Sequence, residues 1–98
     1  MTHDPKKAVE GADIVYTDTW VSLGQEKEAA KRLKVFQPYQ LNKKLVPKGA
    51  LVMHCLPAHR GYEITDDVID RPDSIVFDQS ENRLHMQKAI MLKLLGKA

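Results

Sequence analysis

The sequence contains a single cysteine, Cys55, among 98 residues. One thiol cannot form an intrachain disulfide, and its isolation is typical of proteins in a reducing compartment. No apolar run approaches the roughly 20 residues that a membrane-spanning helix needs. The polar start, with His3, Asp4 and Lys6, does not resemble a secretory signal peptide. These absences predict a cytoplasmic protein with neither a disulfide framework nor a membrane segment.

Neither sign of charge dominates, because Lys and Arg together number 15 and Asp and Glu number 13. The lysines are scattered, with pairs at 6–7 and 43–44, which indicates a solvated surface rather than a nucleic-acid-binding patch. The length of 98 residues suffices for one small domain with a modest core, but not for a two-domain enzyme.

Short apolar runs alternate with helical patterns along the chain. We expect strands at 14–16, 50–53 and 74–77, and helices at 5–9, 25–36 and 80–95. The apolar runs are continuous, a pattern typical of parallel strands that helices cover on both faces. The sequence therefore predicts an α/β fold with a parallel sheet flanked by helices. Because the chain opens in a helix with no strand before it, we expect an earlier strand–helix unit to be missing.

A polar loop follows each expected strand, at 17–26, 54–61 and 78–83. Ligands of open parallel sheets bind beyond the C-terminal ends of the strands. We therefore expect the three loops to share one edge of the sheet and to form a site there.

The first and third loops carry charged side chains suited to a polar ligand. The Asp18 carboxylate can bind an ammonium group, and the Ser22 hydroxyl can bind a carboxylate or cap a helix; alternatively, both only shape the turn. Arg83 lies in the first turn of the last expected helix, where a cation is unfavourable with the helix dipole. An anion or a polarised oxygen nearby would offset that cost. Alternatively, Arg83 is simply exposed to solvent and its interaction with the helix dipole is slightly unfavourable.

The second loop places Cys55 directly after His54. A thiolate beside a base can act as a nucleophile, but adjacent side chains on an extended chain point in opposite directions. We therefore expect no His54–Cys55 dyad, and Cys55 is either a small buried residue or part of a site. The spacing of Cys55 with His54, His59 and His85 lacks a pattern such as C-x-x-C, which argues against zinc.

Three segments resemble motifs of one enzyme family, the ornithine carbamoyltransferases. His54-Cys55-Leu56-Pro57, followed by Arg60-Gly61-x-Glu63-Ile64, resembles a hallmark of that family. The segment 18–26 resembles its ornithine-binding loop, and Glu81-Asn82-Arg83 before a long helix resembles its C-terminal motif. The motifs occur in family order, and the resemblance covers nearly the whole chain. Leu23 stands where the family commonly has Met, an exchange that conserves volume and leaves the identity of the amine open.

The resemblance implies transfer of a carbamoyl group from carbamoyl phosphate to the δ-amine of ornithine, which gives citrulline and phosphate in arginine metabolism. It implies no metal and no organic cofactor. It also implies a role for each site residue. For ornithine, Asp18 binds the α-ammonium, Ser22 and Leu23 hold the carboxylate end, and Cys55 with Asp18 orients the δ-amine. For the carbamoyl group, the Leu56 carbonyl accepts a hydrogen bond from the amide, and Arg83 stabilises charge on the oxygen.

The resemblance further implies that residues 1–98 are the C-terminal part of a Rossmann-like ornithine-binding domain. The family's N-terminal domain, whose Ser-Thr-Arg-Thr stretch grips carbamoyl phosphate, has no counterpart here. We therefore expect the chain alone to be inactive, and its last helix to be displaced or packed on a neighbouring chain. The family is built on trimers.

Alternative functions remain for the chain. One is a sister carbamoyltransferase that uses putrescine or an acylated ornithine, although Asp18 and Ser22 favour an amino acid with a free α-amine. Another is a non-catalytic α/β interaction module. An aspartate-using relative is disfavoured by Cys55.

Overall fold

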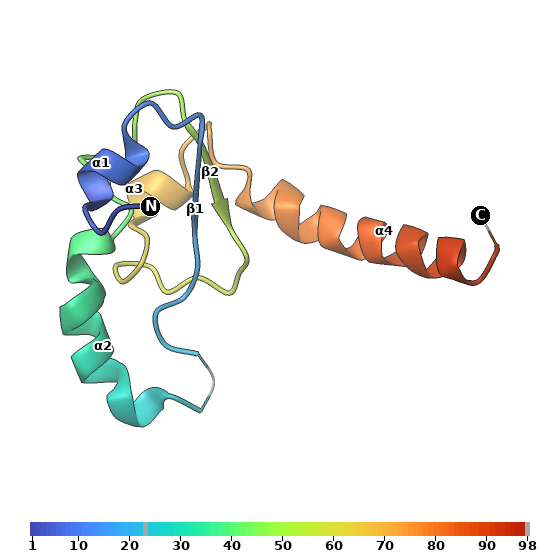
Figure 1. The fold of residues 1–98 in the computed structure, drawn as a ribbon, viewed down its shortest axis with the longest axis horizontal. Coiled ribbons are helices and arrows are strands. Elements are labelled where there is room, and N and C mark those ends of the chain that lie inside the picture. Colours follow the sequence, from blue (N-terminus) through green and yellow to red (C-terminus); the bar gives the residue numbers. More distant parts are fainter. Residues whose placement is uncertain (23, 98) are drawn as a thin grey trace.

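A computed structural model describes residues 1–22 and 24–97 of the chain. Short helices and strands form a small body, from which one long helix projects (Figure 1). In chain order the elements are α1 (Pro5–Val9), β1 (Ile14–Thr17), the 3-10 turn η1 (Glu26–Glu28), α2 (Ala29–Phe36), the 3-10 turn η2 (Gln37–Tyr39), β2 (Leu51–His54), α3 (Asp66–Ile69) and α4 (Val76–Leu94). The expected first helix and first two strands are confirmed to within one residue, whereas the expected helix at 25–36 begins with the 3-10 turn η1.

The strands β1 and β2 lie side by side and run parallel, which confirms the predicted direction of the sheet (Figure 1). Ile14 pairs with Leu51, and Thr17 pairs with His54 at the other end. Successive residues of a strand point to opposite faces. Val15 lies on the face that is buried, whereas Ile14 lies on a face where apolar side chains remain exposed.

The expected third strand at 74–77 is wrong. Ser74 makes one isolated parallel bridge with Val52, and the Ile75 N–H donates to the Val52 carbonyl at 2.9 Å. The chain then turns into α4 at Val76, whose side chain is fully buried. The apolar run Ile75-Val76-Phe77 therefore begins a helix and not a strand, and its buried residue, Val76, packs in the core instead of pairing with β2. The last helix begins at Val76 rather than at about residue 80.

The core lies between the buried face of the sheet and α3. Its buried members are Val15, Leu41, Val46, Ala50, Val52, Ile64, Val68, Ile69 and Val76. Burying one such branched side chain contributes about 1.5–3 kcal/mol, so this cluster supplies most of the stabilisation available to the body. It also fixes β2 and the segment that follows it, which carries the candidate site.

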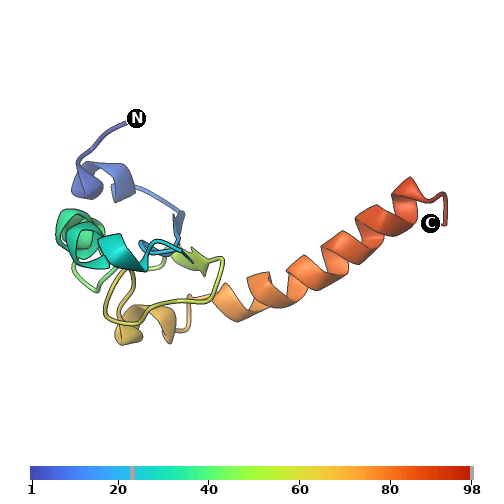
Figure 2. The same cartoon turned by 90° about the horizontal axis from the view of Figure 1, so that it is seen from below.

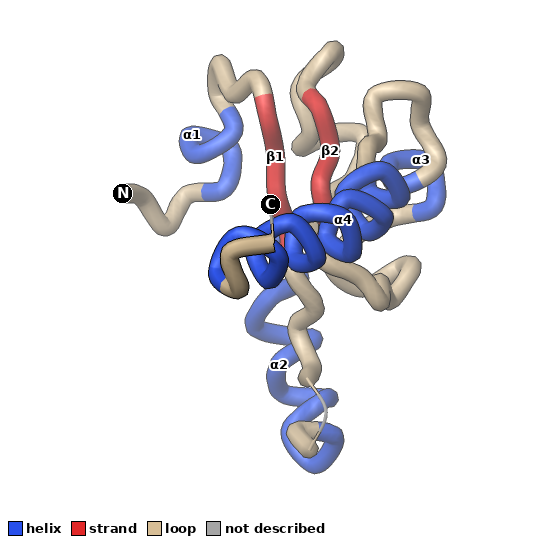
Figure 3. Tube along the Cα trace, turned by 90° about the vertical axis from the view of Figure 1, so that its right-hand side faces the viewer, coloured by secondary structure: helices blue, strands red, loops and turns tan. Residues whose placement is uncertain are grey.

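Helix α4 extends away from the body in two perpendicular views (Figures 1 and 2) and is foreshortened at the front of Figure 3. Beyond Val76, every residue of α4 except Gln79 is exposed. The exposed apolar side chains of α4 and its C-cap are Phe77, Leu84, Met86, Ile90, Met91, Leu92, Leu94 and Leu95. The expectation that the last helix is displaced or packed on a neighbouring chain stays a prediction. None of the described helices is long and apolar enough to span a membrane.

The root of α4 is tied to the end of the sheet through Gln79. Its side-chain oxygen accepts from the His54 backbone N–H at 3.1 Å, and its amide nitrogen donates to the Tyr16 hydroxyl at 3.3 Å. Both strands therefore contact α4 through one glutamine, which lies immediately beside the loops that follow β1 and β2.

Candidate functional site

The loops after β1 and β2 meet at one edge of the sheet. Because Thr17 and His54 are paired in the parallel register, Asp18 and Cys55 each lie one residue beyond the last pair. The Cys55 Sγ donates to the Asp18 Oδ1 at 2.8 Å. The predicted convergence is therefore confirmed for the first two of the three expected loops, and it brings together a carboxylate and a thiol. The third expected loop, at 78–83, is wrong, because these residues lie within α4.

The Asp18–Cys55 contact favours a protonated thiol beside an ionised carboxylate. The hydrogen bond from Cys55 lowers the pKa of the Asp18 carboxyl, and the Thr19 backbone N–H, 2.6 Å from Asp18 Oδ1, lowers it further. Partial burial raises the pKa of the Cys55 thiol, and the hydrogen bond to Asp18 raises it again. An ordinary thiol is already protonated near neutral pH. Cys55 is thus a hydrogen-bond donor at neutral pH, and Asp18 is an anion.

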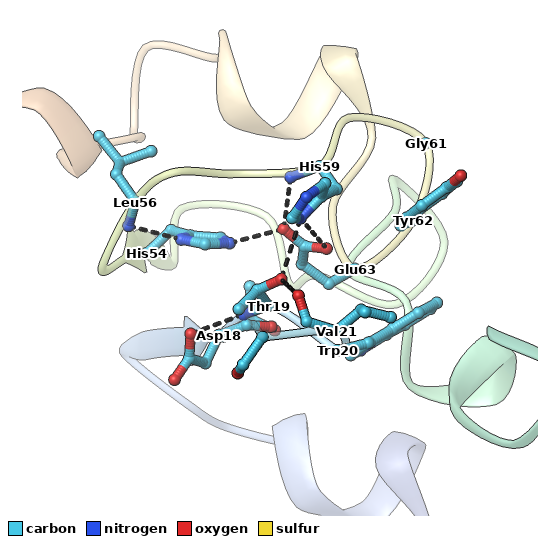
Figure 4. A network of polar contacts seen from close by, with 12 residues as sticks. Asp18, Thr19, Trp20, Val21, His54, Leu56, His59, Gly61, Tyr62 and Glu63 are labelled. Atoms are coloured by element: carbon cyan, nitrogen blue, oxygen red, sulfur yellow. Dashed lines mark hydrogen bonds and ion pairs between the residues drawn. The ribbon is translucent and has the colours of Figure 1, made fainter. Parts of the chain in front are cut away.

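His54 does not serve Cys55 as a base. Its ring is fully buried, with Nδ1 accepting from the Leu56 backbone N–H at 2.8 Å and Nε2 lying 2.8 Å from the Glu63 Oε1 (Figure 4). Since Nδ1 accepts, the ring proton is on Nε2 and is donated to Glu63. Both ring nitrogens are therefore engaged away from the thiol, which confirms that His54 and Cys55 form no dyad.

Glu63 closes the second loop on itself. Its side chain is fully buried, and its Oε1 accepts from the His54 Nε2–H and from the His59 backbone N–H at 2.7 Å. Its Oε2 has no hydrogen-bond partner among the described residues and lies 3.9 Å from the His59 Nδ1. Burying a carboxylate is costly unless donors surround it, so its place here indicates that the loop is built around it. Sequence reasoning noted Glu63 only within a motif and missed this role, which no local pattern in the sequence indicates.

Leu56 has an unusual backbone in the same loop. Its φ is +53°, a left-handed conformation that is uncommon outside glycine. The hydrogen bond from its N–H to His54 holds it there. Such conformations cluster at functional sites, where surrounding structure maintains them. The unusual conformation of Leu56 is thus consistent with the expectation that its carbonyl contributes to the site.

Arg60 holds the outer side of the loop to α3. Its guanidinium contacts Asp66 at 2.9 Å and binds Asp70 through two hydrogen bonds. These bonds lower the pKa of the Asp70 carboxyl and raise that of Arg60. Arg60 therefore stabilises the position of the loop relative to α3.

The remaining expected residues are not joined to the pair. Ser22 is exposed, and its backbone N–H donates to the Gln25 side chain at 3.4 Å. Leu23 lies outside the described residues. Arg83 is exposed on α4 and makes no hydrogen bond or ion pair with any described residue. Its expected place in the first helical turn is wrong, because α4 begins seven residues earlier at Val76; the argument from the helix dipole therefore does not apply to it.

No three His, Cys, Asp or Glu side chains within 1–22 and 24–97 lie in a group that could hold a metal ion. The polar chemistry of the described edge thus rests on the Asp18–Cys55 pair and on the network around Glu63.

Comparisons with known proteins point to one family. The profile described as "Aspartate/ornithine carbamoyltransferase, Asp/Orn binding domain" matches residues 1–94. An ornithine carbamoyltransferase of Thermococcus kodakarensis is 59% identical over 99 residues, which cover 98% of this chain and 31% of that protein. One of Archaeoglobus fulgidus is 63% identical over 100 residues, which cover 99% of this chain and 33% of the relative.

Solved structures of the same family have a similar fold. The solved ornithine carbamoyltransferase from Pyrococcus furiosus superposes with a TM-score of 0.82 at 59% identity, over 92% of this chain and 30% of that one. The α/β fold with a parallel sheet and flanking helices is thus shared with a solved structure. The chain spans about a third of the length of the curated relatives it matches.

Proposed function

The chain belongs to the aspartate/ornithine carbamoyltransferase family, and from that premise we propose that it is the amino-acid-binding part of an ornithine carbamoyltransferase. The whole protein would transfer the carbamoyl group of carbamoyl phosphate to the δ-amine of ornithine, giving citrulline and phosphate. We place this reaction in arginine metabolism and in the cytoplasm, and assign it no metal and no organic cofactor.

One observation carries the proposal: the contact of 2.8 Å between the Cys55 thiol and the Asp18 carboxylate at the ends of two paired strands. Asp18 is anionic and exposed, as a partner for the α-ammonium of an amino acid must be. The Cys55 thiol is protonated and gives its one proton to Asp18, so it does not attack the substrate, and its sulfur can accept from an amine N–H and orient that amine. Holding both reactants in one geometry is itself a large part of catalysis in such a transfer.

The other site residues have roles at the edges of this pair. Ser22 and Leu23, which follow Asp18 in the first loop, would hold the carboxylate end of ornithine. The Leu56 carbonyl would accept from the carbamoyl amide, which its held backbone conformation supports. Arg83 would stabilise the charge that develops on the carbamoyl oxygen, as an oxyanion donor does. Its exposed guanidinium, without an ion pair to the described residues, is available to an anion.

The rest of the site lies outside this chain in the proposal. Residues 1–98 would form the C-terminal part of the ornithine-binding domain, and a carbamoyl-phosphate domain of the same polypeptide would supply the phosphate-binding residues. The exposed apolar side chains of α4 support the proposal that this helix packs on that domain. The whole protein would assemble on a trimer, and the isolated chain would form no citrulline.

Steady-state kinetics of the full-length protein tests the proposal. Citrulline formation from carbamoyl phosphate and ornithine is compared with carbamoylation of putrescine and of N-acetylornithine, and with the Asp18→Asn variant. We expect ornithine to have the highest kcat/KM, and Asp18→Asn to raise its KM because the ammonium loses a charged partner.

Two results would overturn this assignment. A preference for putrescine or for the acylated amine would transfer the chain to a sister enzyme. Absence of both turnover and ornithine binding by calorimetry would favour a non-catalytic interaction module.

A further inference from the structure

A second hydrogen bond joins the two loops beside the Asp18–Cys55 pair. The His59 Nδ1 lies 2.9 Å from the Thr19 Oγ1. Thr19 follows Asp18 directly, and Figure 4 shows dashed lines that join His59 to both Thr19 and Glu63. Adjacent residues of the first loop therefore meet the second loop at separate points, Asp18 at the thiol and Thr19 at the imidazole.

The direction of this bond follows from the proton count. The Thr19 hydroxyl has one proton, which it donates to the Val21 carbonyl at 3.2 Å. With its proton on Val21, the hydroxyl oxygen accepts from His59, an arrangement that places the ring proton of His59 on Nδ1. The Glu63 Oε2, 3.9 Å from the same nitrogen, places a carboxylate oxygen where a proton on Nδ1 is favoured. The bond therefore runs from the second loop to the first.

His59 is itself held from two sides. Its backbone N–H donates to the buried Glu63 Oε1 at 2.7 Å. Its ring stacks on Tyr62, with centroids 5.9 Å apart and planes 15° from parallel. In the first loop, Asp18 and Ser22 are exposed, and the buried Trp20, which stacks on Phe36 with ring centroids 6.1 Å apart, anchors the loop one residue beyond Thr19. The bond from His59 thus adds a second support to Thr19, between the anchored Trp20 and the exposed Asp18.

We propose that His59 is a positioning residue, whose Nδ1–H holds Thr19 so that the neighbouring Asp18 carboxylate stays against Cys55 and faces the amine of the substrate. The inference rests on the proposed function for the identity of that substrate. His59 acts through Thr19 and does not exchange a proton with the reacting groups. It determines how well the amino acid is held, and it leaves the binding of the carbamoyl donor unchanged.

Paired substitutions in the full-length protein separate the hydrogen bond from the packing around it. His59→Phe keeps an aromatic ring on Tyr62 and removes the donor, whereas His59→Asn restores an N–H close to the position of Nδ1. Thr19→Val keeps the shape and removes the acceptor, whereas Thr19→Ser retains it. His59→Asn and Thr19→Ser are therefore the matched controls.

The expected kinetic result is a selective loss of ornithine affinity. A neutral hydrogen bond of this kind corresponds to a change of about 3- to 10-fold in binding. We expect His59→Phe and Thr19→Val each to raise the KM for ornithine by that factor, with a smaller change in kcat and an unchanged KM for carbamoyl phosphate. The double variant should be no worse than either single one, because both remove the same bond. The two controls should stay near the wild type.

A second measurement needs no ornithine. If Asp18 moves away from Cys55, the thiol loses one of the contacts that raise its pKa. Alkylation by iodoacetamide, followed by mass spectrometry of the peptide that contains Cys55, should then be faster in His59→Phe and Thr19→Val than in the wild type and the controls.

The outcomes are distinct. A wild type that does not carbamoylate ornithine contradicts the proposed function, and the alkylation rates still decide the role of His59. Wild-type turnover with unchanged KM and alkylation in both test variants overturns the positioning role. Additive effects in the double variant, or an equal loss of affinity for carbamoyl phosphate, would overturn it as well.

Discussion

Replacing Glu63 by alanine should open the second loop far more than replacing it by glutamine. The alanine variant leaves two donors without an acceptor, the buried His54 Nε2–H and the His59 backbone N–H. An unsatisfied buried donor costs about 1–3 kcal/mol, so the two together cost about 2–6 kcal/mol. Glutamine retains an acceptor oxygen and loses only the charge, for which the difference between charged and neutral hydrogen bonds suggests about 1 kcal/mol.

Hydrogen exchange of the full-length protein measures this opening directly, because amides exchange through local opening as well as through global unfolding. Since about 1.4 kcal/mol corresponds to a factor of ten, exchange in peptides covering 55–62 should accelerate about 25-fold or more in Glu63→Ala and about fivefold in Glu63→Gln. Peptides from α1 are the internal control, because Glu63 makes no hydrogen bond to that helix in the described part of the chain. Equal acceleration in the two variants, or none in either, would refute the view that the Glu63 oxygen closes the loop.

Three further predictions concern the thiol and the outer ion pair. Cys55→Ser in the full-length protein should weaken ornithine binding and slow turnover but leave a working enzyme; a carbamoylated Cys55 that forms and decays at the catalytic rate, seen by mass spectrometry, would contradict this. Asp18→Asn should shift the pH profile of Cys55 alkylation to lower pH, since Asp18 contributes to the raised pKa of the thiol; an unchanged profile would show that burial alone sets it. The pKa of Asp70 is lowered from 3.8 in the folded state, so its pairing with Arg60 stabilises the fold above that pH and is lost as the pH falls through the folded value. Asp70→Asn should therefore lose less stability on acidification than the wild type, as urea midpoints measured across about pH 5 to 3 would show, and parallel curves would count against it.

The convergence of Asp18 and Cys55 was predictable because it depends on local signals. Two short apolar runs indicated strands, the lack of polar residues within those runs indicated parallel pairing, and parallel strands end at the same edge. The structure pairs Thr17 with His54, and the next residue of each strand enters the site. No long-range information was needed beyond the direction of the sheet.

The end of the sheet was not predictable in the same way. Ile75-Val76-Phe77 suits a strand and the root of a helix equally, because a short apolar run carries no clear period. Only the burial of Val76 against the core distinguishes the two, and that is a tertiary contact. Because the run was predicted to be a strand, the start of α4 was predicted too late in the sequence. Arg83 was therefore wrongly placed beside the helix N-terminus.

The role of Glu63 was hidden for another reason. His54 and Glu63 are nine residues apart, and the loop between them has neither helical nor strand periodicity. Their meeting depends on how the whole loop returns to its start, which no local pattern specifies. The same holds for the bond from His59 to Thr19, which joins residues forty apart in the sequence.

Helix α4 acts mechanically as a lever. Its 19 residues form a rod about 28 Å long at 1.5 Å per residue. Its first turn is fixed to the body, because the Gln79 side chain accepts a hydrogen bond from the backbone N–H of His54, the residue before Cys55. A tilt of α4 about this turn would move the Gln79 side chain and the His54 backbone that it binds. Contacts along the exposed side of α4 would therefore bear on the position of Cys55, the next residue in the chain.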